Sequence, residues 1–281
     1  MMMRGGHEGL FALCLAATAP ALAQPAACGE LFTVETHERT TTRYALAGPP
    51  AAPAGVLLLL PGGGGHVDLD ERGCARALKG NWLVRSLPLF HEAGFATVLV
   101  DAPSDHTGED GLAGFRIAEA HAQDIGRVIA DVRARTKTQR PVWLVGTSRG
   151  TISAANAASR LAGAAAADGL VLSSPVTAGA RARQAWVIQS VFDLPLEAVR
   201  MPVLVVGHAE DTCVRTPAAL MERIAARTEG AREQVVTVTG GPGTQKASGV
   251  DACEGRSPHG FVGQEAEVVA GIVRFIGGGR Y

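Results

Sequence analysis

The sequence predicts an α/β fold in which a mostly parallel central sheet is flanked by helices on both faces. Hydrophobic residues make up 47% of the 281 residues, which is enough to bury a sizeable core. Several short apolar runs are continuous rather than alternating, and such runs are typical of strands covered on both faces. Helical patterns separate these runs, as crossovers between parallel strands require.

The elements follow from this pattern in chain order. A segment rich in Thr, Val and Phe at residues 31–46 is expected to form a pair of strands. Further strands are expected at residues 56–60, 95–100, 142–145, 170–172, 203–206 and 234–238, and the first of them is expected to be fully buried. Helices are expected at residues 81–93, 113–136, 151–161, 185–199, 217–227 and 264–276. We find no internal repeat and no low-complexity linker, so residues 24–281 are interpreted as a single domain.

Residues 1–23 have the features of a secretory signal peptide. A weakly positive start with Arg4 precedes an apolar stretch at residues 10–17. Ala21 and Ala23 then offer a cleavage site of small residues. The apolar stretch is too short to span a membrane. We therefore expect cleavage after Ala23, a periplasmic or secreted protein, and no stable membrane insertion.

The charge balance argues against a nucleic-acid partner. The chain has 26 Lys and Arg against 27 Asp and Glu, with a formal net charge of −1. These charges form no basic block of the kind that nucleic-acid-binding proteins show. The sequence gives no indication of the oligomeric state.

The most specific motif is the G-x-S-x-G pentapeptide from Gly146 to Gly150, between an expected strand and an expected helix. In a nucleophile elbow of this kind, a tight turn lifts the serine Oγ out of the backbone. Glycines two positions before and after Ser148 avoid a collision with the neighbouring helix and strand. Ser148 is therefore the candidate nucleophile. It needs an adjacent base, because a serine hydroxyl is otherwise a poor nucleophile.

The acid and the base are expected later in the chain, in the order Ser, Asp or Glu, His. Asp211 lies in the turn after the strand at residues 203–206, and Glu210 is the alternative acid. His259 lies in a loop of Ser, Pro and Gly before the last helix. The competing interpretations are that Asp211 only caps a helix starting near Thr216 and that His259 is a solvated loop residue.

A run of glycines at residues 62–65 follows the first buried strand. Glycines allow backbone N–H groups to face a developing oxyanion without interference from side chains. Gly63 is the first candidate donor and Gly64 the second, together with the amide of Arg149. The alternatives are a phosphate-binding loop, for which neither G-K-[ST] nor G-x-G-x-x-G is present, and a plain flexible loop.

Four cysteines remain after the expected cleavage: Cys28, Cys74, Cys213 and Cys253. In an exported protein they suggest two disulfides, with free buried thiols as the alternative. Cys213 lies two residues after Asp211, and Cys253 lies six before His259. If Asp211 contacts His259, a Cys213–Cys253 bond becomes plausible. Cys28 and Cys74 then form the second pair.

Other polar residues give weaker signals. Four of them follow one expected strand and are candidates to line the pocket: Asp101, Ser104, Asp105 and His106. His121 and Asp124 fall on an expected helix and are interpreted as surface or structural residues, and Trp143 as a core residue. The group His66, Asp68 and Asp70 matches no metal-site spacing, so we expect no metal and no other cofactor.

With these residues, the chain resembles the α/β-hydrolase superfamily, in particular compact exported bacterial serine esterases. The resemblance extends over residues 31–276, and the elbow is its most specific part. The glycine run resembles the family's oxyanion loop, with Pro61 where a histidine often stands. Family members carry a lid after the strand that corresponds to residues 170–172. Here residues 174–200 are short, which implies a minimal cap and a shallow, open pocket.

The resemblance implies an α/β-hydrolase fold and a serine carboxylic-ester hydrolase acting on small-molecule esters of short or medium acyl chains. Ser148 would form the acyl-enzyme, with His259 as base and Asp211 as the orienting acid. A serine peptidase or amidase with the same triad is the second hypothesis. A non-catalytic binding member of the fold is the third.

Overall fold

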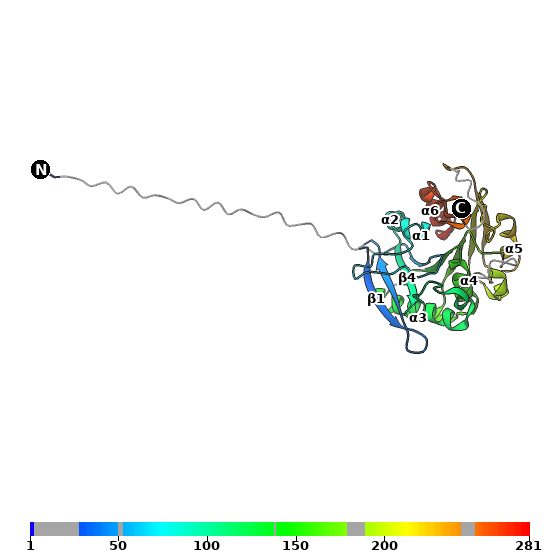
Figure 1. Cartoon of the computed structure of the whole chain (residues 1–281), viewed down its shortest axis with the longest axis horizontal. Coiled ribbons are helices and arrows are strands. Elements are labelled where there is room, and N and C mark those ends of the chain that lie inside the picture. The colour runs from blue at the N-terminus through cyan, green and yellow to red at the C-terminus, as the bar shows by residue number, and fades with distance from the viewer. Residues whose placement is uncertain (3–27, 50–52, 138, 179–188, 243–250) are drawn as a thin grey trace.

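The computed structural model describes residues 1–2, 28–49, 53–137, 139–178, 189–242 and 251–281. The expected signal peptide lies almost entirely outside these residues, so its cleavage stays a prediction. The described chain forms an eight-stranded sheet with helices on both sides (Figure 1). None of its helices combines the length and apolar character needed to cross a membrane.

The sheet has the order β1-β2-β4-β3-β5-β6-β7-β8. Its strands are β1 Glu30–Glu35, β2 Thr41–Ala47, β3 Val56–Leu60, β4 Ala96–Pro103, β5 Val142–Thr147, β6 Gly169–Ser173, β7 Val203–His208 and β8 Glu233–Val238. Strands β3 to β8 are parallel to one another, whereas β2, at one side of the sheet, is antiparallel to both β1 and β4. All expected strands are present. Strand β8 is partly exposed, because it is the other edge strand.

Helices cover both faces of this sheet. They are α1 Trp82–Arg85, α2 Leu87–Glu92, α3 Glu119–Thr136, α4 Gly150–Arg160, α5 Glu222–Ala225 and α6 Glu265–Ile276. In Figure 1, α3 and α4 lie on one side of the sheet, and α1, α2 and α6 lie on the other. Alternate residues of β3 serve the two layers: Val56 and Leu58 pack with α3 and α4, whereas Leu57 and Leu59 pack with the opposite layer.

Several expected helices are shorter than the sequence pattern suggested. The helix expected at residues 81–93 is divided between α1 and α2 at Ser86, because Pro88 lacks an N–H and is tolerated only in a first turn. The 113–136 segment begins with a 3₁₀ turn, η1 Ala113–Ile117. Ala118 then adopts an extended conformation before α3 starts.

Two other helical predictions fail in part. Residues 217–227 contain a 3₁₀ turn, η5 Ala218–Leu220, and the short α5. The prediction for residues 185–199 falls partly outside the described residues. The described part holds two 3₁₀ turns, η3 Val191–Asp193 and η4 Leu196–Ala198.

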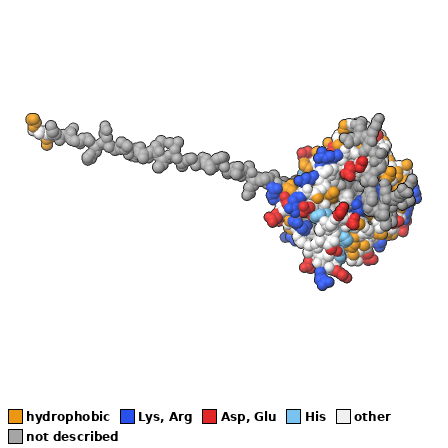
Figure 2. Space-filling view, in the orientation of Figure 1, with side chains coloured by type: hydrophobic (Ala, Val, Ile, Leu, Met, Phe, Trp, Pro, Cys, Tyr) orange, Lys and Arg blue, Asp and Glu red, His pale blue; other side chains and the backbone are white. Residues whose placement is uncertain are grey.

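The surface and core agree with the composition. Basic and acidic side chains are interspersed over the face shown in Figure 2, without a large area of one sign among the coloured residues. Trp143 is buried and packs edge-on against Phe275, with ring centroids 6.0 Å apart, so its prediction as a core residue is confirmed. The parallel strands β3 to β7 all direct their carboxyl ends to the same edge, where loops of such sheets form sites.

Candidate active site

The turn between β5 and α4 places Ser148 in a left-handed conformation, with φ of +51°. This conformation is uncommon for a residue with a side chain and stores strain at the turn. A Cβ on Gly146 would lie 2.5 Å from the Gly150 carbonyl oxygen, and one on Gly150 would lie 2.0 Å from the Leu60 carbonyl oxygen. Glycine is therefore required on both sides of the turn, because the strand and helix approach so closely.

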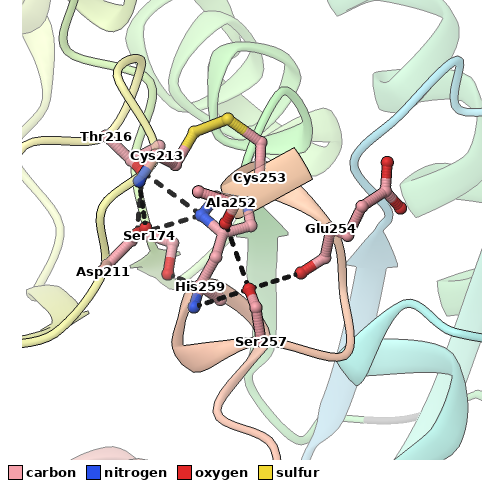
Figure 3. Close-up of a disulfide and its surroundings, with 9 residues drawn as sticks. All are labelled: Ser174, Asp211, Cys213, Thr216, Ala252, Cys253, Glu254, Ser257 and His259. Atoms are coloured by element: carbon pink, nitrogen blue, oxygen red, sulfur yellow. Dashed lines mark hydrogen bonds and ion pairs between the residues drawn. A yellow bond between two sulfur atoms is a disulfide. The ribbon is translucent and has the colours of Figure 1, made fainter. Parts of the chain in front are cut away.

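His259 and Asp211 meet at the same edge of the sheet (Figure 3). Nδ1 of His259 lies 2.9 Å from Oδ2 of Asp211, and the two side chains are only 4% and 1% exposed. The alternative acid, Glu210, is exposed, and its backbone N–H donates to Nδ1 of His208. With Nδ1 of His259 held by the carboxylate, Nε2 is left to accept a proton. Nε2 is buried and bonded to none of the described residues.

Thr216 is a further member of this group that the sequence pattern did not single out. Its hydroxyl donates to Oδ2 of Asp211 at 2.8 Å and lies 3.2 Å from Nδ1 of His259. The backbone N–H of Cys213 donates to the other carboxylate oxygen, Oδ1 of Asp211, at 2.9 Å. Asp211 therefore does more than cap a helix. A threonine five residues after an acid carries no signal in the sequence that would have identified this contact.

Replacing Thr216 with valine is expected to lower kcat about tenfold with little change in KM. Valine keeps the shape but removes a hydrogen bond to a charged carboxylate, and such bonds contribute about 1.5–3 kcal/mol. Steady-state kinetics on a p-nitrophenyl ester measure the change. Thr228→Val is the matched control, because Thr228 makes an equivalent bond to Glu233 elsewhere. An unchanged kcat in Thr216→Val would show that the hydrogen bond from Thr216 to Asp211 does not support catalysis.

The loop that carries His259 is held from several sides. Arg85 of α1 donates to the carbonyls of Gly255 and Gly260 on either side of the histidine, and it pairs with Glu265 of α6. Ser174, just after β6, donates to the backbone carbonyl of His259 at 2.7 Å (Figure 3). These contacts fix the position of the imidazole, so that its orientation does not depend on Asp211 alone.

Both predicted disulfides are present. Cys213 is bonded to Cys253, and Cys28 is bonded to Cys74. The first bond joins the turn that carries Asp211 to the segment that precedes His259 (Figure 3). It therefore ties together the acid and base loops, as the spacing of the cysteines suggested. The second bond lies near the β1–β2 edge of the sheet.

The glycine run after β3 lies beside the elbow. A Cβ on Gly62 would be 2.8 Å from Cβ of Ser148. Gly63 has φ of +57° and lines the same cavity as Ser148, whereas Gly64 is not among the lining residues. The amides of Gly63 and Gly64 are bonded to no acceptor in the described part of the chain. Gly63 is thus better placed than Gly64 to face a substrate.

Arg116 stabilises the glycine run at residues 62–65 through hydrogen bonds to backbone carbonyls. Its buried guanidinium donates to the carbonyls of Pro61 and Gly63, at 3.3 and 3.2 Å. The N–H of Gly65 also donates to the Gly62 carbonyl. Because a peptide unit is planar, fixing the carbonyls of Gly62 and Gly63 also fixes the directions of the amides that follow them. The loop is therefore set before a substrate arrives, although no sequence motif identified Arg116.

Arg116 is fully buried and forms no salt bridge with any described carboxylate. Burial, together with the nearby charge of Arg149, lowers the pKa of Arg116 to about 9, so the guanidinium remains charged at neutral pH. It donates to Oγ of Ser153, which lies 2.9 Å from Nε2 of His121. His121 and Asp124 are buried, so they are structural, and the alternative of surface residues is wrong.

Acid is expected to destabilise the protein through His121. Burial, with a further contribution from Arg116, lowers the pKa of His121 from 6.5 to about 3. Between these values the unfolded chain binds the proton more tightly, so stability falls as pH decreases from 6.5 towards 3. The loss is about 1.4 kcal/mol per pH unit, or roughly 2 kcal/mol between pH 6.5 and 5. Urea unfolding at both pH values should show that His121→Gln loses less free energy of unfolding than the parent between pH 6.5 and 5. Equal losses in the two proteins would disprove that His121 causes the effect.

Ser148 and His259 open into one cavity of about 380 Å³. Its lining residues are Gly63, Leu78, Gly80, Asn81, Trp82, Thr147, Ser148, Cys253, Glu254, Gly255, Arg256, His259 and Gly260. Asp101, Ser104, Asp105 and His106 do not line it, contrary to the expectation from their strand-end positions. Asp101 instead accepts hydrogen bonds from the amides of Val67 and Leu69, which orders the loop beyond the glycine run.

Two lining residues come from the start of the divided helix. Trp82 donates from Nε1 to the hydroxyls of Thr147 and Ser173, at 2.8 and 3.0 Å, which fixes the indole under the elbow. Asn81 caps α1 by accepting the N–H of Leu83. The sequence pattern predicted only an amphipathic helix at residues 81–93. It could not show that the first turn of this helix lines the same cavity as Ser148.

Comparison with known proteins identifies the architecture. No family model matches the sequence, and no curated protein matches it either. A serine hydrolase homologue from Coxiella burnetii is 17% identical with a TM-score of 0.55, over 88% of this chain and 96% of that one. The chain has the α/β-hydrolase fold.

Two more solved structures with the α/β-hydrolase fold superpose over most of their length. Dienelactone hydrolase from Anabaena variabilis is 16% identical with a TM-score of 0.60, over 89% of this chain and 97% of that one. Proline iminopeptidase from Mycobacterium smegmatis is 13% identical with a TM-score of 0.58, over 89% and 98% of the two chains. At such identities the likeness concerns the fold, and the reaction must be argued from the site.

Proposed function

We propose that this chain is an exported serine hydrolase that cleaves carboxylic esters through an acyl-enzyme on Ser148, with residues 24–281 as one catalytic domain. The observation that carries the proposal is that Ser148 and His259 line one cavity while His259 is bonded to the buried Asp211. The features of a signal peptide and the two disulfides support export, because disulfides persist in oxidising compartments.

In the proposed reaction, Oγ of Ser148 attacks the ester carbonyl and Nε2 of His259 takes the hydroxyl proton. Asp211 holds the imidazole through Nδ1 and stabilises its positive charge. The amides of Gly63 and Arg149 donate to the oxyanion. His259 then returns the proton to the leaving alcohol. A water molecule, again activated by His259, releases the acid.

The cavity favours short or medium acyl groups. Its volume of about 380 Å³ lies near the small end of ligand pockets, and Leu78 and Trp82 supply apolar walls. Glu254 and Arg256 are exposed at its rim and offer charges of both signs rather than one binding site for a charged peptide terminus. The solved neighbours are named as hydrolases of different kinds, which supports hydrolysis without selecting the bond.

Labelling with a fluorophosphonate tests the nucleophile directly. We expect one label per molecule, found on Ser148 by peptide mass spectrometry, with fluoride as the leaving group. Turnover of p-nitrophenyl esters should decrease as the acyl chain lengthens and should exceed turnover of the matching p-nitroanilides. A folded protein that is not labelled would support a non-catalytic role, and faster cleavage of the anilide would support an amidase or peptidase.

A further inference from the structure

Two histidines and an aspartate from separate loops converge outside the catalytic cavity. His37 lies in the turn between β1 and β2, and Asp105 and His106 follow β4. Their ligand atoms all lie within 4.8 Å of one another. Oδ2 of Asp105 is 3.0 Å from Nε2 of His37 and 3.8 Å from Nε2 of His106. Only His66, Asp68 and Asp70 were considered as metal ligands from the sequence, because the distance along the chain between His37 and Asp105 gives no motif.

Both imidazoles present Nε2 to the centre of this cluster because their other nitrogens are engaged. The carboxylate of Asp124, which is 3% exposed, lies 2.6 Å from Nδ1 of His37 and also accepts the backbone N–H of His37. Nδ1 of His106 lies 3.3 Å from the carbonyl oxygen of Gly111. Such outer contacts select the tautomer in which Nε2 carries a lone pair, as in carboxylate–histidine–metal sites.

The rings are also held in position by an apolar support. Phe115 stacks on His106 with centroids 4.3 Å apart and an interplanar angle of 19°, and its ring lies 4.8 Å from that of His37. The side chains of His37 and His106 are 18% and 25% exposed, and that of Asp105 is 45% exposed. The cluster is therefore supported by protein contacts on one side and accessible to solvent on the other.

The two separations from Oδ2 of Asp105 suit a small tetrahedral cation. Ligand atoms about 2.0 Å from Zn²⁺ in tetrahedral geometry lie about 3.3 Å apart, and the separations of 3.0 and 3.8 Å bracket this value. Two imidazole nitrogens with one carboxylate oxygen form a donor set that Zn²⁺ commonly takes. Without a cation, the lone pair on Nε2 of His37 faces Oδ2 of Asp105, and only a proton between these two atoms would make the contact favourable.

We propose that His37, Asp105 and His106 bind a Zn²⁺ ion, with Asp124 as a positioning residue and water in the fourth place. The ion would connect the β1–β2 turn with the loop after β4 and, through Asp124, with α3. The role is structural, since none of these residues lines the catalytic cavity.

Calorimetric titration of the tag-free, EDTA-treated mature protein with ZnCl₂ tests the site. We expect one ion per chain, and a rise of roughly 5–10 °C in the thermal midpoint when Zn²⁺ is at about 100 times its Kd. The Co²⁺ form should show the visible absorption of a tetrahedral complex. Asp124→Asn should weaken binding about 10- to 100-fold while retaining the three ligands.

The double variant His37→Gln/His106→Gln should lose the site, with circular dichroism confirming that it still folds. His66→Gln is the matched control, because His66 also contacts a buried carboxylate, that of Asp101, but belongs to no three-membered cluster among the described residues. His259→Gln tests for Zn²⁺ at the catalytic histidine and should bind as the parent does. Equal Zn²⁺ affinity in the parent and the double variant, or a loss in either control, would overturn the proposal.

Discussion

Ser148→Ala and His259→Gln are each expected to reduce kcat for p-nitrophenyl acetate by roughly 10⁴- to 10⁶-fold. Each change removes one end of the same proton transfer, so the remaining residue can do little alone. The double variant should therefore be no slower than the worse single variant. Strongly non-additive losses of this kind distinguish residues that act as a unit from residues that contribute separately.

The neighbouring acids supply the control for this prediction. Asp211→Asn should lower kcat by about 10³- to 10⁴-fold, because the amide no longer holds the required tautomer of His259. Glu210→Gln changes the adjacent, exposed acid and should leave kcat nearly unchanged. Additive losses in the Ser148 and His259 variants, or a larger effect at Glu210 than at Asp211, would exclude the proposed triad.

Removing the Cys213–Cys253 disulfide is expected to cost both stability and activity. The bond joins residues 40 positions apart, and the chain-entropy model assigns about 4 kcal/mol to a closed loop of this size. Its loss should also release the acid turn from the base loop, because the amide of Cys213 bonds directly to Asp211. We expect kcat of the Cys213→Ala/Cys253→Ala variant to fall at least tenfold.

The Cys28–Cys74 disulfide provides a control that separates the effect on stability from the effect on activity. Cys28 and Cys74 are 46 positions apart, so their loop has nearly the same entropic value. The Cys28→Ala/Cys74→Ala variant should lose a similar free energy of unfolding in urea but keep its kcat. If the two double variants lose activity equally at a temperature where both are folded, then the first bond has no special role in catalysis.

Continuous apolar runs were sufficient to predict the strands, because a strand buried on both faces has few polar positions to obscure it. Helix boundaries were harder, as the segment around Pro88 shows. An amphipathic pattern continues across Ser86, but the missing N–H of the proline separates α1 from α2. Local chemistry therefore overrode the periodicity there.

The residues of the candidate site also differed in how well they could be predicted. Ser148, Asp211 and His259 could be predicted as candidates because each lies in a loop whose position in the chain order has meaning for this fold. Thr216, Trp82 and Arg116 were missed, since their roles depend on contacts between distant segments that no spacing records. The cluster around His37 was missed for the same reason, with 68 positions separating His37 from Asp105.

The glycine run also bears on how this pocket can be altered. A Cβ on Gly65 would lie 2.7 Å from Nη2 of Arg116, and one on Gly63 would be strained by its positive φ and lie 3.1 Å from Leu78. Only Gly64 has ordinary clearance, at 3.6 Å or more. Variation in acyl preference, whether natural or engineered, is therefore expected to arise at lining side chains such as Leu78 rather than at the glycines themselves.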